Sequence, residues 1–174
     1  GGVIRGDATE QLLDLAEQGH GGPARVLGCR TLGTTALLRG DLAASRARLD
    51  ELLALGRPAA GAPDFPYPYD PWLTGQGYLS VTMLLLGHPG QALAHSDRSL
   101  LGAREAGHHH TLALVLFCRC VLAQLCRDQE ELELQTTALQ AVSAERGFAF
   151  WAAAAEVFRG WLLSQAGNRQ DGIA

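Results

Sequence analysis

The chain contains no lysine, and charge of either sign is sparse among its 174 residues. All fourteen cationic side chains are arginines, and eighteen acidic residues bring the formal net charge to −4, with an isoelectric point near 5.8. We attach no mechanism to the missing lysine. A protein that binds a phosphate backbone normally needs a clustered basic face. The charge balance therefore argues against a nucleic-acid partner.

The sequence also lacks a long uninterrupted apolar run, because Arg119 and Arg127 break the longest one. A bilayer span needs about 20 consecutive, predominantly apolar residues. The start of the chain does not resemble a signal peptide. We therefore predict a cytoplasmic protein without membrane contact. Because the chain begins at Gly1 rather than Met and a further helix is expected to begin near Gly172, we also expect it to be a piece of a longer protein.

Cysteine is scarce, with four residues at positions 29, 118, 120 and 126. A helical domain of this length does not need disulfides to be stable. Cys118, Cys120 and Cys126 lack the Cys-x-x-Cys spacing of a zinc site or redox pair. We predict reduced and mostly buried thiols.

No arrangement of residues suited to catalysis or to holding a cofactor is present. The consecutive histidines 108–110 point in different directions at a helix start, so they make a poor metal cage. His95-Ser96-Asp97 contains the residue types of a catalytic triad, but adjacency in sequence is not the required geometry. The acidic pair Glu130-Glu131 falls on the hydrophilic side of a helix. We therefore expect no enzyme activity, no metal and no cofactor.

What the sequence does contain is a globular composition, with 47% hydrophobic and 18% charged residues, and a repeat. The turns 105–110 and 145–150 lie forty residues apart, and a long apolar run follows each of them. Similar short turns occur at Gly40-Asp41 and Gly87-His88. Around each turn the apolar residues have the period of an amphipathic helix, and no useful alternating strand pattern is found. The pattern indicates stacked pairs of helices.

We therefore predict an all-α fold of about seven to eight helices in a single domain, 1–174. The helices are expected to form antiparallel hairpins that stack into a right-handed superhelix. The predicted elements are an N-terminal helix at 9–18, hairpins at about 23–55, 71–106 and 108–145, an incomplete hairpin at 148–174, and a proline- and aromatic-rich loop at 56–71.

The spacing of small residues resembles that of the tetratricopeptide repeat (TPR) family. In that family a small residue lies seven positions before the turn glycine, where the two helices of a hairpin touch. Here the small residues are Gly33, Ser80, Cys120 and Gly160, ahead of turn positions 40, 87, 127 and 167. Arg127 and Leu132 depart from the pattern, and the period exceeds the usual 34 residues. The third repeat is therefore degenerate.

From about Pro23 to its end, the chain is also similar to the C-terminal helical regions of large bacterial ATPase-type transcriptional regulators and cyclase-like sensors. Tyr69-Asp70-Pro71 and the run 84–93 carry this resemblance. In those proteins the repeats follow a nucleotide-binding domain and sense a ligand or hold a partner. No phosphate loop occurs here, so this chain is not expected to bind ATP. The resemblance implies an interaction or sensor module.

The TPR resemblance implies a ligand groove lined by the first helix of each hairpin. Its positions carry over to candidate groove residues Arg30, Thr34, Thr74, Phe117, Val121, Gln124 and Trp161. Because Arg30 is the only cation among them, we expect an apolar peptide, a helix or a neighbouring domain as partner. A small-molecule receptor that encloses a metabolite is the alternative, and an enzyme accessory domain is a third. The apolar members could equally be ordinary core residues.

The segment 64–72 is rich in proline and aromatic residues, which favour an extended conformation. It is a candidate lid over the groove, through Phe65, Tyr67, Tyr69 and Trp72. The alternative is an ordinary loop whose aromatics cover the core. A homodimer through the C-terminal end is a further expectation, because the last repeat leaves an apolar flank uncovered.

Overall fold

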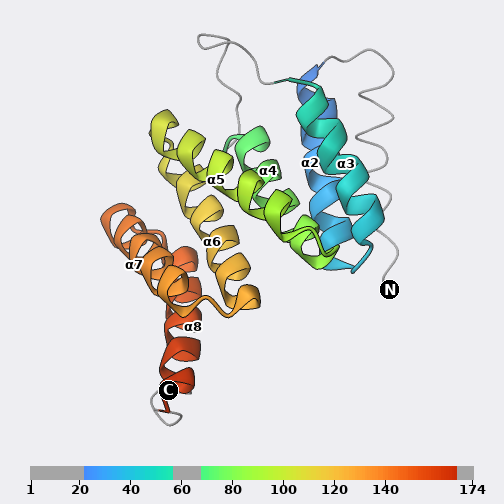
Figure 1. Ribbon diagram of the computed structural model, residues 1–174. Helices are drawn as coiled ribbons and strands as arrows, with labels where there is room; N and C mark the ends of the chain where they lie inside the picture. The colour runs from blue at the N-terminus through green and yellow to red at the C-terminus, as the bar shows by residue number, and fades with distance from the viewer. Residues whose placement is uncertain (1–21, 57–67, 168–174) are drawn as a thin grey trace, which may run out of the picture.

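The computed structural model describes residues 22–56 and 68–167, and these residues form seven helices and no strand (Figure 1). The helices are α2 (Gly22–Leu38), α3 (Leu42–Ala54), α4 (Pro71–Leu85), α5 (Pro89–Ala106), α6 (His109–Cys126), α7 (Gln129–Arg146) and α8 (Ala149–Gln165). The predicted all-α class is confirmed. The predictions for a helix at 9–18, for the end of the last hairpin and for Phe65 and Tyr67 lie outside the described residues.

The helices pack as hairpins that lie side by side (Figure 1). The pairs are α2 with α3, α4 with α5, and α6 with α7, and each second helix also contacts the first helix of the next hairpin. The first helices contact one another in series, from α2 through α4 and α6 to α8. Within the described ranges, the second helices α3, α5 and α7 make no contact with one another. The two sides of the row are therefore packed differently.

The short turns between hairpin helices contain a residue with a left-handed backbone conformation, followed by the residue that caps the next helix. Gly40 and Gly87 have φ values of 82° and 84°, a region that glycine enters without steric penalty. In the described part of the chain, Arg127 is the only non-glycine residue with positive φ, at 58°. The side chains of Asp41 and Asp128 then accept hydrogen bonds from Ala44 N and Glu131 N, respectively, and cap the next helix. The degenerate third turn thus keeps the geometry of the glycine turns.

The start of α4 is fixed from two directions. Asp70 Oδ1 accepts hydrogen bonds from the backbone amides of Trp72 and Leu73, and Pro71 occupies the first turn, where no amide hydrogen is needed. The backbone amide of Asp70 donates to Thr111 Oγ1 on α6 at 2.7 Å. This contact ties the beginning of α4 to α6 and thereby positions Tyr69, the preceding residue.

Small residues do lie where paired helices touch. A Cβ atom on Gly33 would lie 2.6 Å from Leu49 Cγ of α3, which leaves no room for a side chain there. Cys120 Sγ lies 3.8 Å from Thr136 Oγ1 of α7. Leu132, which departs from the small-residue pattern, is fully buried in a cluster with Cys120 and Phe158. The predicted contact is confirmed for the first and third hairpins.

Helix α6 packs against α4, α5, α7 and α8. Within the described residues it is long and apolar enough to cross a membrane, by length and composition alone, and half of it is buried inside the protein. The expectation that Arg119 excludes a span on composition was therefore wrong. A helix at the centre of a helical core passes the same test, so this finding is weak evidence for a membrane.

Candidate functional site

The side chains predicted to line a groove fall into two groups. Thr34, Phe117, Val121, Gln124 and Trp161 are half-buried and lie on first helices, as expected. We call the partly exposed surface of α2, α4, α6 and α8 to which they belong the first-helix face. Phe117 also packs inward, with its ring centroid 5.7 Å from those of Trp151 and Phe158. These residues therefore serve the core and a surface together.

Two predicted site residues belong to the core, so the prediction was wrong for them. Thr74 has no exposed surface, and its hydroxyl donates to the carbonyl of Asp70 at 2.8 Å. Trp72, predicted as part of a lid, is only 7% exposed. The cause is the rotation of α4, because a Cβ atom on Gly77 would lie 3.4 Å from Cys118 Sγ on α6. Tyr78, next to Gly77 on α4, is partly exposed instead.

Arg30 and two tyrosines form a cluster, of which the sequence named Arg30 and Tyr69 as candidates but not Tyr78. The guanidinium carbon of Arg30 lies 4.4 Å from the ring centroid of Tyr69 and 5.2 Å from that of Tyr78. Arg30 Nη1 donates a hydrogen bond to Tyr69 Oη at 3.1 Å. Contacts of a cation with aromatic rings are attractive, and more so where water is excluded. Tyr69 is therefore held against Arg30, and Tyr78 joins the candidate residues.

The surroundings of this cluster are dry. Burial raises the pKa of the Cys118 thiol to about 12. Burial is also the main cause that raises the pKa of Tyr78 to about 12, with a smaller opposing effect from Arg30. Arg30 itself is only 9% exposed. The cluster thus combines one cation with neutral groups in a poorly solvated place, where electrostatic interactions are strengthened.

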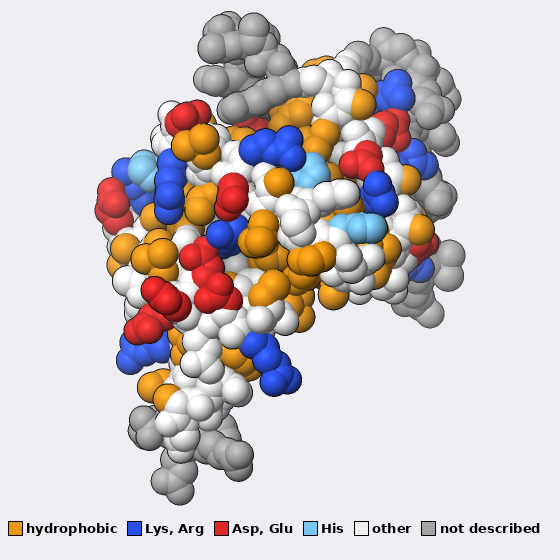
Figure 2. Space-filling view, viewed as in Figure 1, with side chains coloured by type: hydrophobic (Ala, Val, Ile, Leu, Met, Phe, Trp, Pro, Cys, Tyr) orange, Lys and Arg blue, Asp and Glu red, His pale blue; other side chains and the backbone are white. Residues whose placement is uncertain are grey.

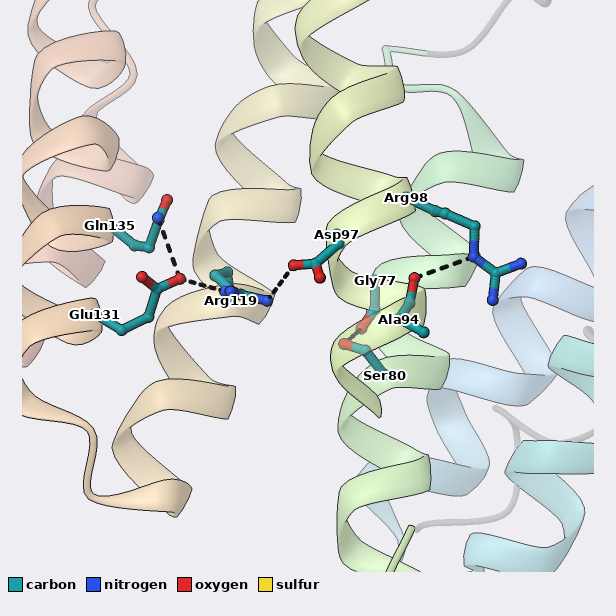
Figure 3. A network of polar contacts seen from close by, with 8 residues as sticks. All are labelled: Gly77, Ser80, Ala94, Asp97, Arg98, Arg119, Glu131 and Gln135. Carbon is teal, nitrogen blue, oxygen red and sulfur yellow. Dashed lines mark hydrogen bonds and ion pairs between the residues drawn. The ribbon is translucent and has the colours of Figure 1, made fainter. Parts of the chain in front are cut away.

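A second arginine, Arg119, lies in a different kind of environment (Figure 3). From α6, Arg119 forms ion pairs with Asp97 on α5 and Glu131 on α7. Gln135 donates to the same carboxylate of Glu131 at 3.3 Å. Beside it lies a hollow of about 260 Å³, lined by Leu93, Arg119, Leu122, Ala123, Cys126, Asp128 and Glu131. Because both acids neutralise Arg119, we interpret this network as a link between three helices.

The side of the second helices carries charges of both signs. In the view shared by Figures 1 and 2, α3 and α5 lie toward the viewer, and acidic side chains gather where α7 begins. A hollow of about 360 Å³ lies between α7 and α8, lined by Gln129, Glu133, Thr136, Thr137, Gln140, Arg159, Leu162, Leu163 and Ala166. Self-association at this end of the chain stays a prediction.

Two of the three consecutive histidines, His108 and His110, have separate roles. His108 caps α6, and its Nδ1 accepts a hydrogen bond from Thr111 N at 3.3 Å. The ring of His110 packs edge-on against Phe148, with centroids 4.9 Å apart. Within the residues that the structure covers, no group of three or more His, Cys, Asp or Glu side chains is placed to hold a metal ion.

Thiol reactivity offers a direct check of the core. Cys29, Cys118 and Cys120 are buried and free, whereas Cys126 is exposed. Burial raises the pKa of Cys29 and of Cys120 to about 11, so at pH 8 almost none of either thiol is the reactive thiolate. We expect one thiol to react quickly with Ellman's reagent in the native protein and all four after unfolding. In the Cys126→Ser variant the fast reaction should disappear; several native thiols reacting at similar rates would contradict this packing.

Compared with known proteins, the chain matches no family model and no curated protein. What the first-helix face and the Arg30 cluster can do is therefore inferred from their geometry.

Proposed function

We propose that this chain is a non-enzymatic, TPR-like interaction module that binds a protein or peptide segment along the first-helix face. The packing of the helices supports this proposal. First helices contact one another, whereas second helices are spread apart, so the row is expected to curve with its first helices on the inner side. A right-handed superhelical stack of this kind presents a concave surface for a partner.

The composition of the face favours an apolar partner. Phe117, Val121 and Trp161 are half-buried aromatic or aliphatic side chains, and Val157 on α8 is 70% exposed. Thr34 and Gln124 add isolated polar points. Amphipathic helices bind grooves of this composition through regularly spaced apolar side chains. We propose a helix, an extended segment or a neighbouring domain as the partner, within a cytoplasmic bacterial regulatory protein that senses a signal.

A small-molecule receptor is the second candidate. The Arg30 cluster favours it, because a buried cation between aromatic side chains offers a fixed polar point inside an apolar surrounding. Both candidates use the same first-helix face, so they differ in the size of the ligand and not in the location of the site.

Selection from a library of random peptides would test the proposed function with a matched pair of variants. Val157→Arg places a charge on the first-helix face, whereas Leu134→Arg does the same on α7, where Leu134 is 61% exposed. We expect Val157→Arg to weaken binding of the selected peptides at least about tenfold, because the new charge would be desolvated in the interface. Leu134→Arg should leave the dissociation constant unchanged in fluorescence polarisation. Equal affinity for both variants would place the binding surface elsewhere and contradict the proposal.

A further inference from the structure

Arg30 is a buried cation for which the described residues provide no carboxylate partner. Its side chain is on α2, 9% exposed, and among the residues that the structure describes no Asp or Glu forms an ion pair with it. The nearby arginines of the first hairpin, Arg25 and Arg48, are instead both paired with Glu51. Removing a cation from water is unfavourable unless an anion or other acceptors replace the water. The described residues therefore supply no anion that would compensate for the burial of Arg30.

Most hydrogen-bond donors of Arg30 are also unused. A guanidinium carries five N–H donors and no acceptor. Nη1 donates to Tyr69 Oη, and Nε is buried without an acceptor among the described residues. Arg30 keeps 9% of its surface exposed, so a ligand can reach part of the side chain.

Tyr69 adds a second donor at the same place. Its hydroxyl oxygen accepts from Arg30 Nη1 and still carries its own hydrogen, for which the described residues provide no acceptor. The phenolic O–H and the guanidinium N–H groups are thus neighbours, 3.1 Å apart between Oη and Nη1. Both groups donate, so the ligand that complements them must accept. The Tyr78 ring, 5.2 Å from the guanidinium carbon, helps to hold the guanidinium group in place.

We propose that Arg30 and Tyr69 bind a carboxylate of the ligand that occupies the first-helix face, with one oxygen on the guanidinium and the other on the phenolic hydrogen or the second guanidinium nitrogen. The inference rests on the proposed function and names the chemistry of its ligand. The planar fork of arginine matches a carboxylate, and the dry surroundings strengthen the pairing. A single cation balances one negative charge, which favours a carboxylate over a doubly charged phosphate.

The carboxylate has two sources, which share this chemistry: an acidic residue within an apolar peptide, or a free organic acid. Sodium octanoate represents the free acid, and octanamide is its neutral match. The peptides acetyl-Leu-Leu-Glu-Leu-Leu-amide and its Gln counterpart represent the acidic residue. The signal of the Arg30 Nε–H group in ¹⁵N-edited NMR spectra, assigned through its loss in Arg30→Lys, reports directly on the guanidinium.

We expect octanoate or the Glu peptide to shift this signal, and to bind about tenfold more tightly than octanamide or the Gln peptide, respectively, as a charge-assisted hydrogen bond predicts. A shift with octanoate assigns the site to free acids, and a shift with the Glu peptide alone assigns it to acidic segments. Arg30→Gln should abolish the preference for the charged ligand. Tyr69→Phe should reduce it several-fold, whereas Arg25→Gln on the same helix should not change it.

If neither octanoate nor the Glu peptide moves the Arg30 signal, or if charged and neutral ligands bind alike, the carboxylate proposal is overturned. The proposed function would then still stand if library peptides bind the wild type and lose affinity in Val157→Arg. Circular dichroism of each variant separates lost binding from lost folding. Tyr69→Phe keeps the ring against Arg30, and so it gives an answer even if Arg30→Gln fails to fold.

Discussion

Replacing Leu49 with alanine is expected to lower the free energy of unfolding by about 3 to 4 kcal/mol. Leu49 of α3 has no exposed surface. Its side chain fills the space left by two glycines: Cβ atoms would lie 2.6 Å from Leu49 Cγ at Gly33 of α2, and 3.8 Å from Leu49 Cδ2 at Gly75 of α4. Glycines have no side chain that could move into the cavity, so little of it would be refilled. Urea unfolding followed by circular dichroism measures the change.

A double-mutant cycle tests the reason for this loss. Gly33→Ala in the wild type forces its new methyl group against Leu49, which is destabilising, whereas the same change in the Leu49→Ala variant meets the space that the leucine has left. We expect the double variant to lose less free energy of unfolding than the sum of the two single losses, by at least about 1 kcal/mol. Additive effects would mean that α2 and α3 do not touch at these residues.

The ends of the helices could be predicted from the sequence because they depend on local chemistry. Gly107 and Gly147 have φ values of 64° and 69°, and each ends a helix. Asp41 caps α3 because its side chain accepts a hydrogen bond from the backbone amide of Ala44, three residues later. Such interactions involve neighbours in the chain, and a short motif therefore carries them.

The site could not be predicted to the same extent, because its geometry depends on residues far apart in sequence. The TPR-like register placed Thr74 on the surface, but Thr74 is fully buried, and at Gly77 a Cβ atom would lie 3.4 Å from Cys118 Sγ and 3.5 Å from Ser99 Oγ. Arg30 meets Tyr69 across thirty-nine positions. Nothing in the period of a helix connects such residues, and so only the packed structure could reveal the cluster.

Arg30 and Arg119 show how structure separates stability from function. Arg119 joins α5, α6 and α7 through two carboxylates, and its charge is balanced within the protein. Within the described residues, Arg30 contacts aromatic rings and a hydroxyl but no carboxylate, so none of them balances its charge. Natural proteins tolerate such local inconsistencies mainly at functional sites. This contrast is the physical reason for placing the ligand at Arg30 and not beside Arg119.

Replacing Phe158 with alanine is expected to lower the free energy of local unfolding around α8 by about 3 to 4 kcal/mol. The stability of the hairpin formed by α2 and α3 should not change. Phe158 of α8 is 4% exposed and packs in one cluster with Cys120, Ala123 and Leu132 of α6 and α7. In a stack where each hairpin contacts only its neighbours, stability is approximately a sum of local terms. The loss should therefore remain close to α8.

Amide hydrogen exchange resolves where the stability is lost. In Phe158→Ala the amides of α8 should lose protection most strongly, those of α6 and α7 less, and those of α2 and α3 should exchange as in the wild type. Leu49→Ala should give the reverse order, since Leu49 lies between α2, α3 and α4. The neighbouring change Val157→Ala, at a side chain that is 70% exposed, should alter stability by less than about 0.5 kcal/mol. Equal loss of protection along the whole chain would show one cooperative unit, which a row of hairpins held only by nearest-neighbour contacts does not predict.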